Sequence, residues 1–149
     1  MKLIQDLREF IELLTSENVR YVVIGDWAYN RYAEPRITGD IDFFVSTDQN
    51  NQRKLRRVLE EFGFGDSLPA ETAPLFKKKM LMIGRPPNRI DLISEIDGVS
   101  FEEAWNEKEP GVLDGLPVLF ISRSLLIRNK KATGRAKDLL DATTLEQYE

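Results

Sequence analysis

The chain has 149 residues, which suits one domain with a sizeable core, and its apolar (42%) and charged (31%) fractions are those of a soluble globular protein. It contains no histidine and no cysteine, which excludes a Ser-His-Asp triad, disulfides and zinc sites built from those residues, so any bound metal must have oxygen ligands, as magnesium, manganese and calcium prefer. The net charge of −4 gives no general reason to expect nucleic-acid binding.

The first half of the chain predicts two helix–strand alternations. Apolar side chains recur at helical spacing over residues 3–14, and the charges among them exclude a signal peptide or a membrane span, so we expect a cytoplasmic protein. A β-branched run over residues 21–24 predicts a buried strand that ends at Gly25, followed by a short helix over residues 27–33. Residues 41–45 predict a second strand.

The second half predicts more strands and then two helices. Thr47 and Asp48 are expected to cap a helix that reaches about residue 62, and residues 63–74 form an irregular connection. The later elements are two strands around a turn (79–83 and 88–93), a short helix with a capping box at residues 100–103, a bent hairpin (112–121) and two helices separated at Gly134 (122–147).

These elements predict a single α+β domain over residues 1–149. We expect a small mixed β-sheet with flanking helices, with a core of about residues 19–121 and a C-terminal helical pair over about residues 122–147.

Three carboxylates in predicted strands are the strongest chemical signal. Because alternate residues of a strand face the same side, Asp40 and Asp42 project together while their neighbours face the core. Asp91 lies in another strand that is otherwise apolar, and it would complete a three-carboxylate site if the two strands are adjacent. Two carboxylates side by side repel unless a cation or proton lies between them, so a divalent metal is one interpretation. The other is that these residues cap strand ends or face solvent.

The order of these features resembles the nucleotidyltransferase superfamily of the DNA polymerase beta type. Its pattern is an apolar strand, a glycine with a second small residue, a short helix and then Asp-x-Asp. The similarity is closest to small bacterial and archaeal members, including the nucleotidyltransferases of abortive-infection toxin–antitoxin pairs. It rests on the segments 23–28, 36–43, 89–92 and 126–141.

The resemblance implies a role for each carboxylate. Asp40 and Asp42 would bind Mg2+ (or Mn2+) ions that carry a nucleoside triphosphate such as ATP. Asp91 would bind the catalytic metal and help to activate the acceptor hydroxyl. The backbone after Gly25 would receive phosphate oxygens at the start of the following helix.

Four further residues have two interpretations each. By the resemblance, Lys130 and Arg135 contact phosphate or substrate; alternatively they form ion pairs with Asp138 or Asp141 that join the last two helices. Asp26 replaces the family's second small residue, where it either caps the helix or occupies the phosphate site and repels the triphosphate. Arg36 either orients the loop before the carboxylates or contacts phosphate, and the structural role is favoured.

The leading functional hypothesis is therefore metal-dependent transfer of a nucleotidyl group from a nucleoside triphosphate to a hydroxyl acceptor. RNA or protein is favoured as the acceptor because one compact domain offers little room for a small-molecule pocket, and no membrane partner is expected. The alternative is a catalytically weak or inactive binding module with the same fold, such as one component of a toxin–antitoxin pair.

Overall fold

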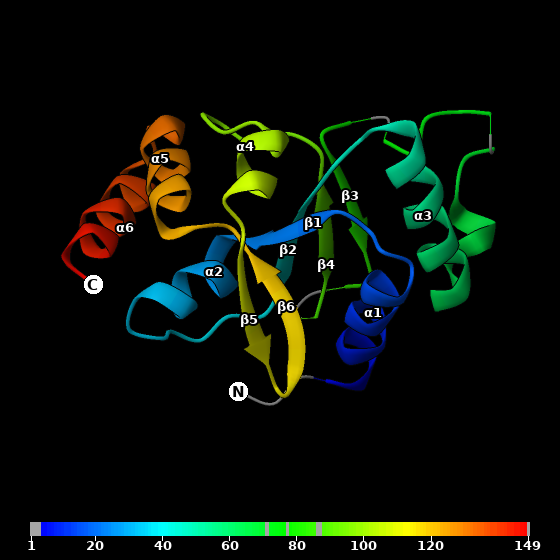
Figure 1. Cartoon of the computed structure of the whole chain (residues 1–149), viewed down its shortest axis with the longest axis horizontal. Helices are drawn as coiled ribbons and strands as arrows, with labels where there is room; N and C mark the ends of the chain where they lie inside the picture. The colour runs from blue at the N-terminus through cyan, green and yellow to red at the C-terminus, as the bar shows by residue number, and fades with distance from the viewer. Residues whose placement is uncertain (1–3, 71, 77, 86–87, 149) are drawn as a thin grey trace.

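A computed structural model describes residues 4–70, 72–76, 78–85 and 88–148, so residue 3 of the first expected helix lies outside the described residues. The described residues form a six-stranded sheet in the order β3-β4-β2-β1-β6-β5 (Figure 1). Its strands are β1 (Tyr21–Ile24), β2 (Ile41–Val45), β3 (Met80–Ile83), β4 (Ile90–Ile93), β5 (Glu109–Leu113) and β6 (Leu116–Phe120).

The sheet is mixed, as the sequence predicted. The central strand β1 pairs antiparallel with β2 and parallel with β6, and β2 pairs parallel with β4. The outer pairs β3–β4 and β5–β6 are antiparallel. Thus β2 and β4, which carry Asp42 and Asp91, are both interior strands of the sheet.

Five of the six α-helices of the described residues flank the sheet in two groups, and α4 packs on β2 through Phe101. In Figure 1, α1 and α3 lie to the right of the strands, whereas α2 and the α5–α6 pair lie to the left. The helices are α1 (Gln5–Ser16), α2 (Gly25–Tyr32), α3 (Gln49–Leu59), α4 (Phe101–Asn106), α5 (Arg123–Thr133) and α6 (Ala136–Gln147). No helix in the described part of the chain is long and apolar enough to cross a membrane.

The local signals for helix ends are confirmed. The Asp48 side chain accepts a hydrogen bond of 2.8 Å from the backbone N–H of Asn51 at the start of α3. Ser100 and Glu103 form the expected capping box of α4. Gly134 separates α5 from α6 with a φ of +70°, a left-handed conformation in which side chains other than glycine are disfavoured.

Some boundaries differ from those expected. Helix α3 ends at Leu59, and a π-helical turn (Glu60–Phe64) and a 3-10 turn (Gly65–Ser67) follow it. The last hairpin begins at residue 109 rather than 112, and α2 begins at Gly25. Terminal residues are set by tertiary contacts as well as local propensity, which is why the sequence fixes them least well.

Strand β2 is buried on both faces, which determines where Asp42 lies. On one face, the Phe43 ring packs against Phe10 of α1 at a centroid distance of 5.7 Å. On the other face, the Phe44 ring contacts Phe101 of α4 at 5.3 Å. Because alternate residues share a face, Asp42 lies on the same side of the sheet as Phe44.

Candidate active site

The two strand carboxylates lie next to each other. Asp42 and Asp91 are register partners in the parallel pair β2–β4, and both line a cleft of about 770 Å³. Asp91 is only 3% exposed. The sequence expectation that the strand of Asp91 pairs beside the strand of Asp42 is confirmed.

This proximity changes the acid–base behaviour of Asp42. Burial, together with a hydrogen bond to Asp91 and the negative charge of that residue, raises the pKa of Asp42 to about 7. The charges of Asp26 and Asp40 act in the same direction. The pair therefore has a strong requirement for a proton or a cation at neutral pH.

An arginine that the sequence analysis did not single out contacts this group. Arg89 Nε donates to Asp91 Oδ1 at 2.7 Å, and Arg89 Nη2 donates to Asp91 Oδ2 at 3.0 Å. The same Nη2 lies 3.3 Å from Asp40 Oδ2. The signal was available, since Arg89 lies two residues before Asp91 and alternate positions of an extended chain face the same side.

Asp40 is placed differently from the other two carboxylates. It precedes β2, and its Oδ1 accepts a hydrogen bond of 3.1 Å from the backbone N–H of Arg89. Asp40 does not line the cleft that Asp42 and Asp91 share. Within the ranges that the structure describes, no three acidic side chains are arranged to hold a metal ion. Of the three carboxylates that were expected to converge, only Asp42 and Asp91 form a close pair. Asp40 is bound to Arg89 instead.

The donor set nevertheless fits a divalent cation of the magnesium class. Asp42 and Asp91 supply only carboxylate oxygens, which are the ligands that Mg2+ and Mn2+ prefer. Burial and then the neighbouring carboxylates raise the pKa of Asp42, so a cation beside it would be stabilising. Asp42 and Asp91 are the residues that would hold such an ion, with Asp40 as a third candidate.

Gly25 allows the β1–α2 turn to lie directly against Asp42. Its φ is +66°, and a Cβ atom added here would collide with the carboxylate of Asp42. A residue with a side chain would therefore be strained and would displace Asp42. Gly25 and Asp26 both line the cleft at the N-terminus of α2, where unpaired backbone N–H groups favour anions.

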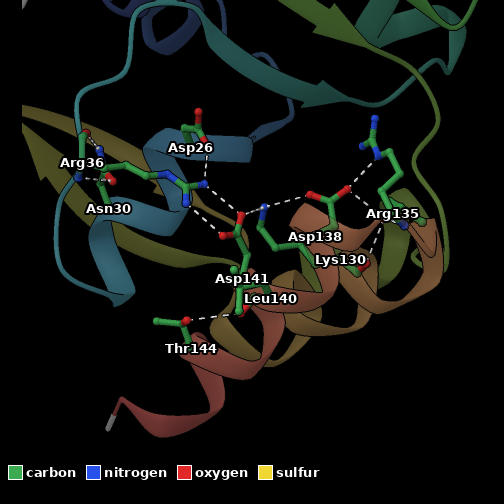
Figure 2. Close-up of polar contacts among 10 residues, drawn as sticks. Asp26, Asn30, Arg36, Lys130, Arg135, Asp138, Leu140, Asp141 and Thr144 are labelled. Atoms are coloured by element: carbon green, nitrogen blue, oxygen red, sulfur yellow. Dashed lines mark hydrogen bonds and ion pairs between the residues drawn. The ribbon is translucent and has the colours of Figure 1, made fainter.

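Asp26 is not a helix cap, so that interpretation is wrong. The N-cap position of α2 is Ile24, and no side chain caps the helix. Instead, Asp26 Oδ1 accepts a hydrogen bond of 2.6 Å from Arg36 Nη2. Figure 2 shows Arg36 extending between Asp26 and Asp141 of α6, to which its two terminal nitrogens donate at 2.9 Å each. Arg36 therefore has a structural role, but that role is to link α2 to α6, which the sequence did not predict.

Lys130 and Arg135 form ion pairs with acidic residues of α6, as one of their two interpretations predicted (Figure 2). The buried Nζ of Lys130 lies 3.0 Å from Asp141 Oδ2 and 3.5 Å from Asp138 Oδ1. Burial opposes ionisation of Asp141, but hydrogen bonds from Arg36 and Lys130 outweigh it and lower its pKa to about 2. Arg135 Nε lies 2.8 Å from Asp138 Oδ2, although the Arg135 side chain is 76% exposed. Lys130 and Arg135 also line the cleft.

Comparison with known proteins gives a match at the level of fold. No family model matches the chain, and no curated protein matches it in sequence. The structure is similar to the crystal structure of a lincosamide antibiotic adenylyltransferase, LnuA, in its lincomycin-bound form, with a TM-score of 0.56 and 13% sequence identity over 97% of each chain. The expected fold class, a nucleotidyltransferase-like α+β fold with a mixed sheet, is confirmed.

Proposed function

We propose that this protein transfers a nucleotidyl group from a nucleoside triphosphate to a hydroxyl acceptor, with Mg2+ or Mn2+ as cofactor. The observation that carries the proposal is the Asp42–Asp91 pair, which lines a cleft beside the Gly25 turn. The fold, which is similar to that of an adenylyltransferase over 97% of each chain, adds support.

Each part of the cleft has a role in this proposal. Backbone N–H groups at the start of α2 bind phosphate oxygens, because the helix N-terminus is electropositive. A divalent cation, when bound, balances the charge of the carboxylates and of the triphosphate. The Asp42–Asp91 pair, with Asp40 nearby, orients the reacting groups and accepts the proton of the acceptor hydroxyl. The acceptor oxygen forms a bond to the α-phosphorus, the bond from that phosphorus to the β-phosphate oxygen breaks, and pyrophosphate leaves.

Lys130 and Arg135 have different roles in the proposal. The ammonium group of Lys130 is buried between two carboxylates, so it fixes the arrangement of α5 and α6 and is not free to follow a ligand. Arg135 is exposed, and Asp138 keeps hydrogen bonds or ion pairs with Thr133 and Lys130 when Arg135 moves away. Arg135 is therefore the better candidate for a contact with the triphosphate.

The acceptor class is open to direct test. The sequence argument for RNA or protein was that a small domain lacks room for a small-molecule pocket. The cleft of about 770 Å³ removes that argument, and the structure of LnuA, a chain of similar length, holds bound lincomycin. A small molecule with a hydroxyl group is therefore proposed alongside RNA and protein.

The test is a transfer assay with each nucleoside triphosphate labelled at the α-phosphate. The full chain is incubated with Mg2+ or Mn2+ and with total RNA, total protein or a panel of small hydroxyl compounds. We expect label to move to one acceptor class, and transfer to be lost in Asp42→Asn and Asp91→Asn. The matched control is Asp97→Asn, which alters another carboxylate of the same cleft. Transfer that survives in Asp42→Asn would contradict the proposal.

One observation favours the alternative, a catalytically weak binding module such as a toxin–antitoxin component. Three cations beside the start of α2 or in the α5–α6 pair are already matched by carboxylates within the protein. Arg36 pairs with Asp26 and Asp141, and Lys130 and Arg135 pair with acids of α6. Absence of triphosphate binding in calorimetry, with and without Mn2+, would favour this module over the enzyme.

A further inference from the structure

We propose that Arg89 is an internal counter-ion of the site, which competes with a divalent cation for Asp91 and Asp40. This inference rests on the proposed function, because the divalent cation belongs to that function. Arg89 is thus a positioning residue that sets how readily the carboxylates accept a metal.

The guanidinium of Arg89 lies beside the carboxylates whose charge a bound metal ion would balance. Arg89 holds both oxygens of Asp91, at 2.7 and 3.0 Å, and its Nη2 also lies 3.3 Å from Asp40 Oδ2. One cation is therefore shared between two of the three candidate metal ligands. While it is there, the described residues offer no group of three acidic side chains arranged for a metal. In the described part of the chain Arg89 forms ion pairs with Asp40 and Asp91 but none with Asp42.

The carboxylates keep their places when the guanidinium is removed. Asp91 lies in β4 between β2 and β3, and it is 3% exposed, so the strand and its neighbours determine its position. Asp40 is held through the backbone N–H of Arg89, which every substitution except proline preserves. A substitution of Arg89 therefore removes its positive charge but largely preserves the positions of Asp91 and Asp40.

Two physical effects predict opposite outcomes, and the structure decides between them. Loss of a group that orients a metal ligand typically weakens metal affinity by about 10- to 100-fold. Loss of a positive charge beside the site removes its repulsion of the incoming cation and frees both oxygens of Asp91. Because burial and the backbone N–H already hold the two carboxylates, the second effect is the larger one here.

The experiment measures Mn2+ binding to the full chain without nucleotide, from the free-Mn2+ signal in electron paramagnetic resonance. We expect Arg89→Gln to lower the Kd for Mn2+ at least fivefold relative to wild type. Arg89→Lys, which keeps a charge but loses the forked contact, should give an intermediate Kd at least twofold lower. The control Lys79→Gln removes a cation that lines the same cleft and pairs with Glu95, and it should change the Kd less than twofold. Asp42→Asn should lose binding.

Several results would overturn the inference. A Kd in Arg89→Gln above that of wild type would show that Arg89 supports the metal site, and an equal Kd would show that it does not compete with the metal. If Arg89→Gln fails to fold by circular dichroism, Arg89→Lys decides the matter, and an unchanged or higher Kd in that variant would be the contrary result. If wild type and Asp42→Asn both bind no Mn2+, the metal role in the proposed function fails as well. Equal binding by wild type and the Arg89 variants defeats only the present inference.

Discussion

Asp42 of β2 and Asp91 of β4 are register partners in adjacent parallel strands, so the sheet holds their carboxylates on one face, side by side. Phe43 and Phe44 pack on opposite faces of β2 and hold that strand in place. Because alternate residues share a face, the Asp42 side chain lies on the same side of the sheet as Phe44. The chemistry of the site follows from this pairing of two like charges at a cleft.

The pairing predicts an unusual dependence of stability on pH. The pKa of Asp42 is raised to about 7 in the folded protein, mainly by burial and by Asp91, from the ordinary aspartate value of 3.8. The stabilising contribution of the protonated form is complete below pH ~4, the unfolded value, and is lost as the pH rises through about 7. Between pH 5 and 8, metal-free wild type should lose on the order of 1–3 kcal/mol more unfolding free energy than Asp42→Asn. Urea unfolding at both pH values measures this, and equal losses in the two proteins would contradict the pairing.

Gly25 should tolerate no side chain because of Asp42. Gly25→Ala combines left-handed strain of about 1–2 kcal/mol with a collision against the Asp42 carboxylate. Gly115→Ala is the matched control, since Gly115 has a similar φ of +81° but open space around it. We expect Gly25→Ala to cost at least about 1 kcal/mol more stability than Gly115→Ala, and also to weaken Mn2+ binding. Indistinguishable behaviour of the two variants in urea unfolding and Mn2+ titration would refute this.

Lys130 and Arg135 should separate into a structural and a binding residue. Lys130→Met leaves Asp138 and Asp141 buried with less positive charge, so it should destabilise the fold by about 3–5 kcal/mol. Arg135→Gln removes an exposed partner and should cost less than about 1 kcal/mol. Calorimetry with a non-hydrolysable triphosphate should show binding several-fold weaker in Arg135→Gln. Unchanged affinity in that variant would remove Arg135 from the proposed site.

Asp26 should oppose triphosphate binding, although less than an unpaired carboxylate does. Its charge is partly balanced by Arg36 at 2.6 Å, and Arg36 keeps its contacts with Asp141 when Asp26 is changed. Asp26→Asn therefore leaves more positive charge at the start of α2. We expect triphosphate affinity to rise several-fold at a stability cost below about 1 kcal/mol, as is typical of partly exposed ion pairs. Paired titrations of wild type and Asp26→Asn measure this effect, and equal affinities would show that Asp26 does not face the phosphates.

Much of the site could be predicted from local patterns. The alternation of Asp42 with the buried Ile41 and Phe43 follows from the two-residue period of a strand, and so does the placing of Asp91 among apolar neighbours in β4. The caps at Asp48 and Ser100 depend on short-range hydrogen bonds, which the sequence shows directly.

The ion pairs were harder to predict because they depend on tertiary structure. Arg36 and Asp141 are 105 residues apart in sequence, and their contact exists only because α6 lies near α2. In the same network Asp26 binds Arg36 and does not cap α2, although aspartate is a common capping residue. The contact of Arg89 with Asp91 could have been predicted from their two-residue spacing, but its contact with Asp40, just before β2, exists only because β2 and β4 are adjacent.

The most direct test of the central claim is a crystal structure of the protein with Mn2+ and a non-hydrolysable nucleoside triphosphate, with the metal located by its anomalous scattering. The account predicts a Mn2+ peak bound to Asp42 and Asp91, and a triphosphate whose phosphates contact the backbone at the start of α2. A triphosphate bound elsewhere, or Mn2+ bound without contact to Asp42 or Asp91, would contradict the account.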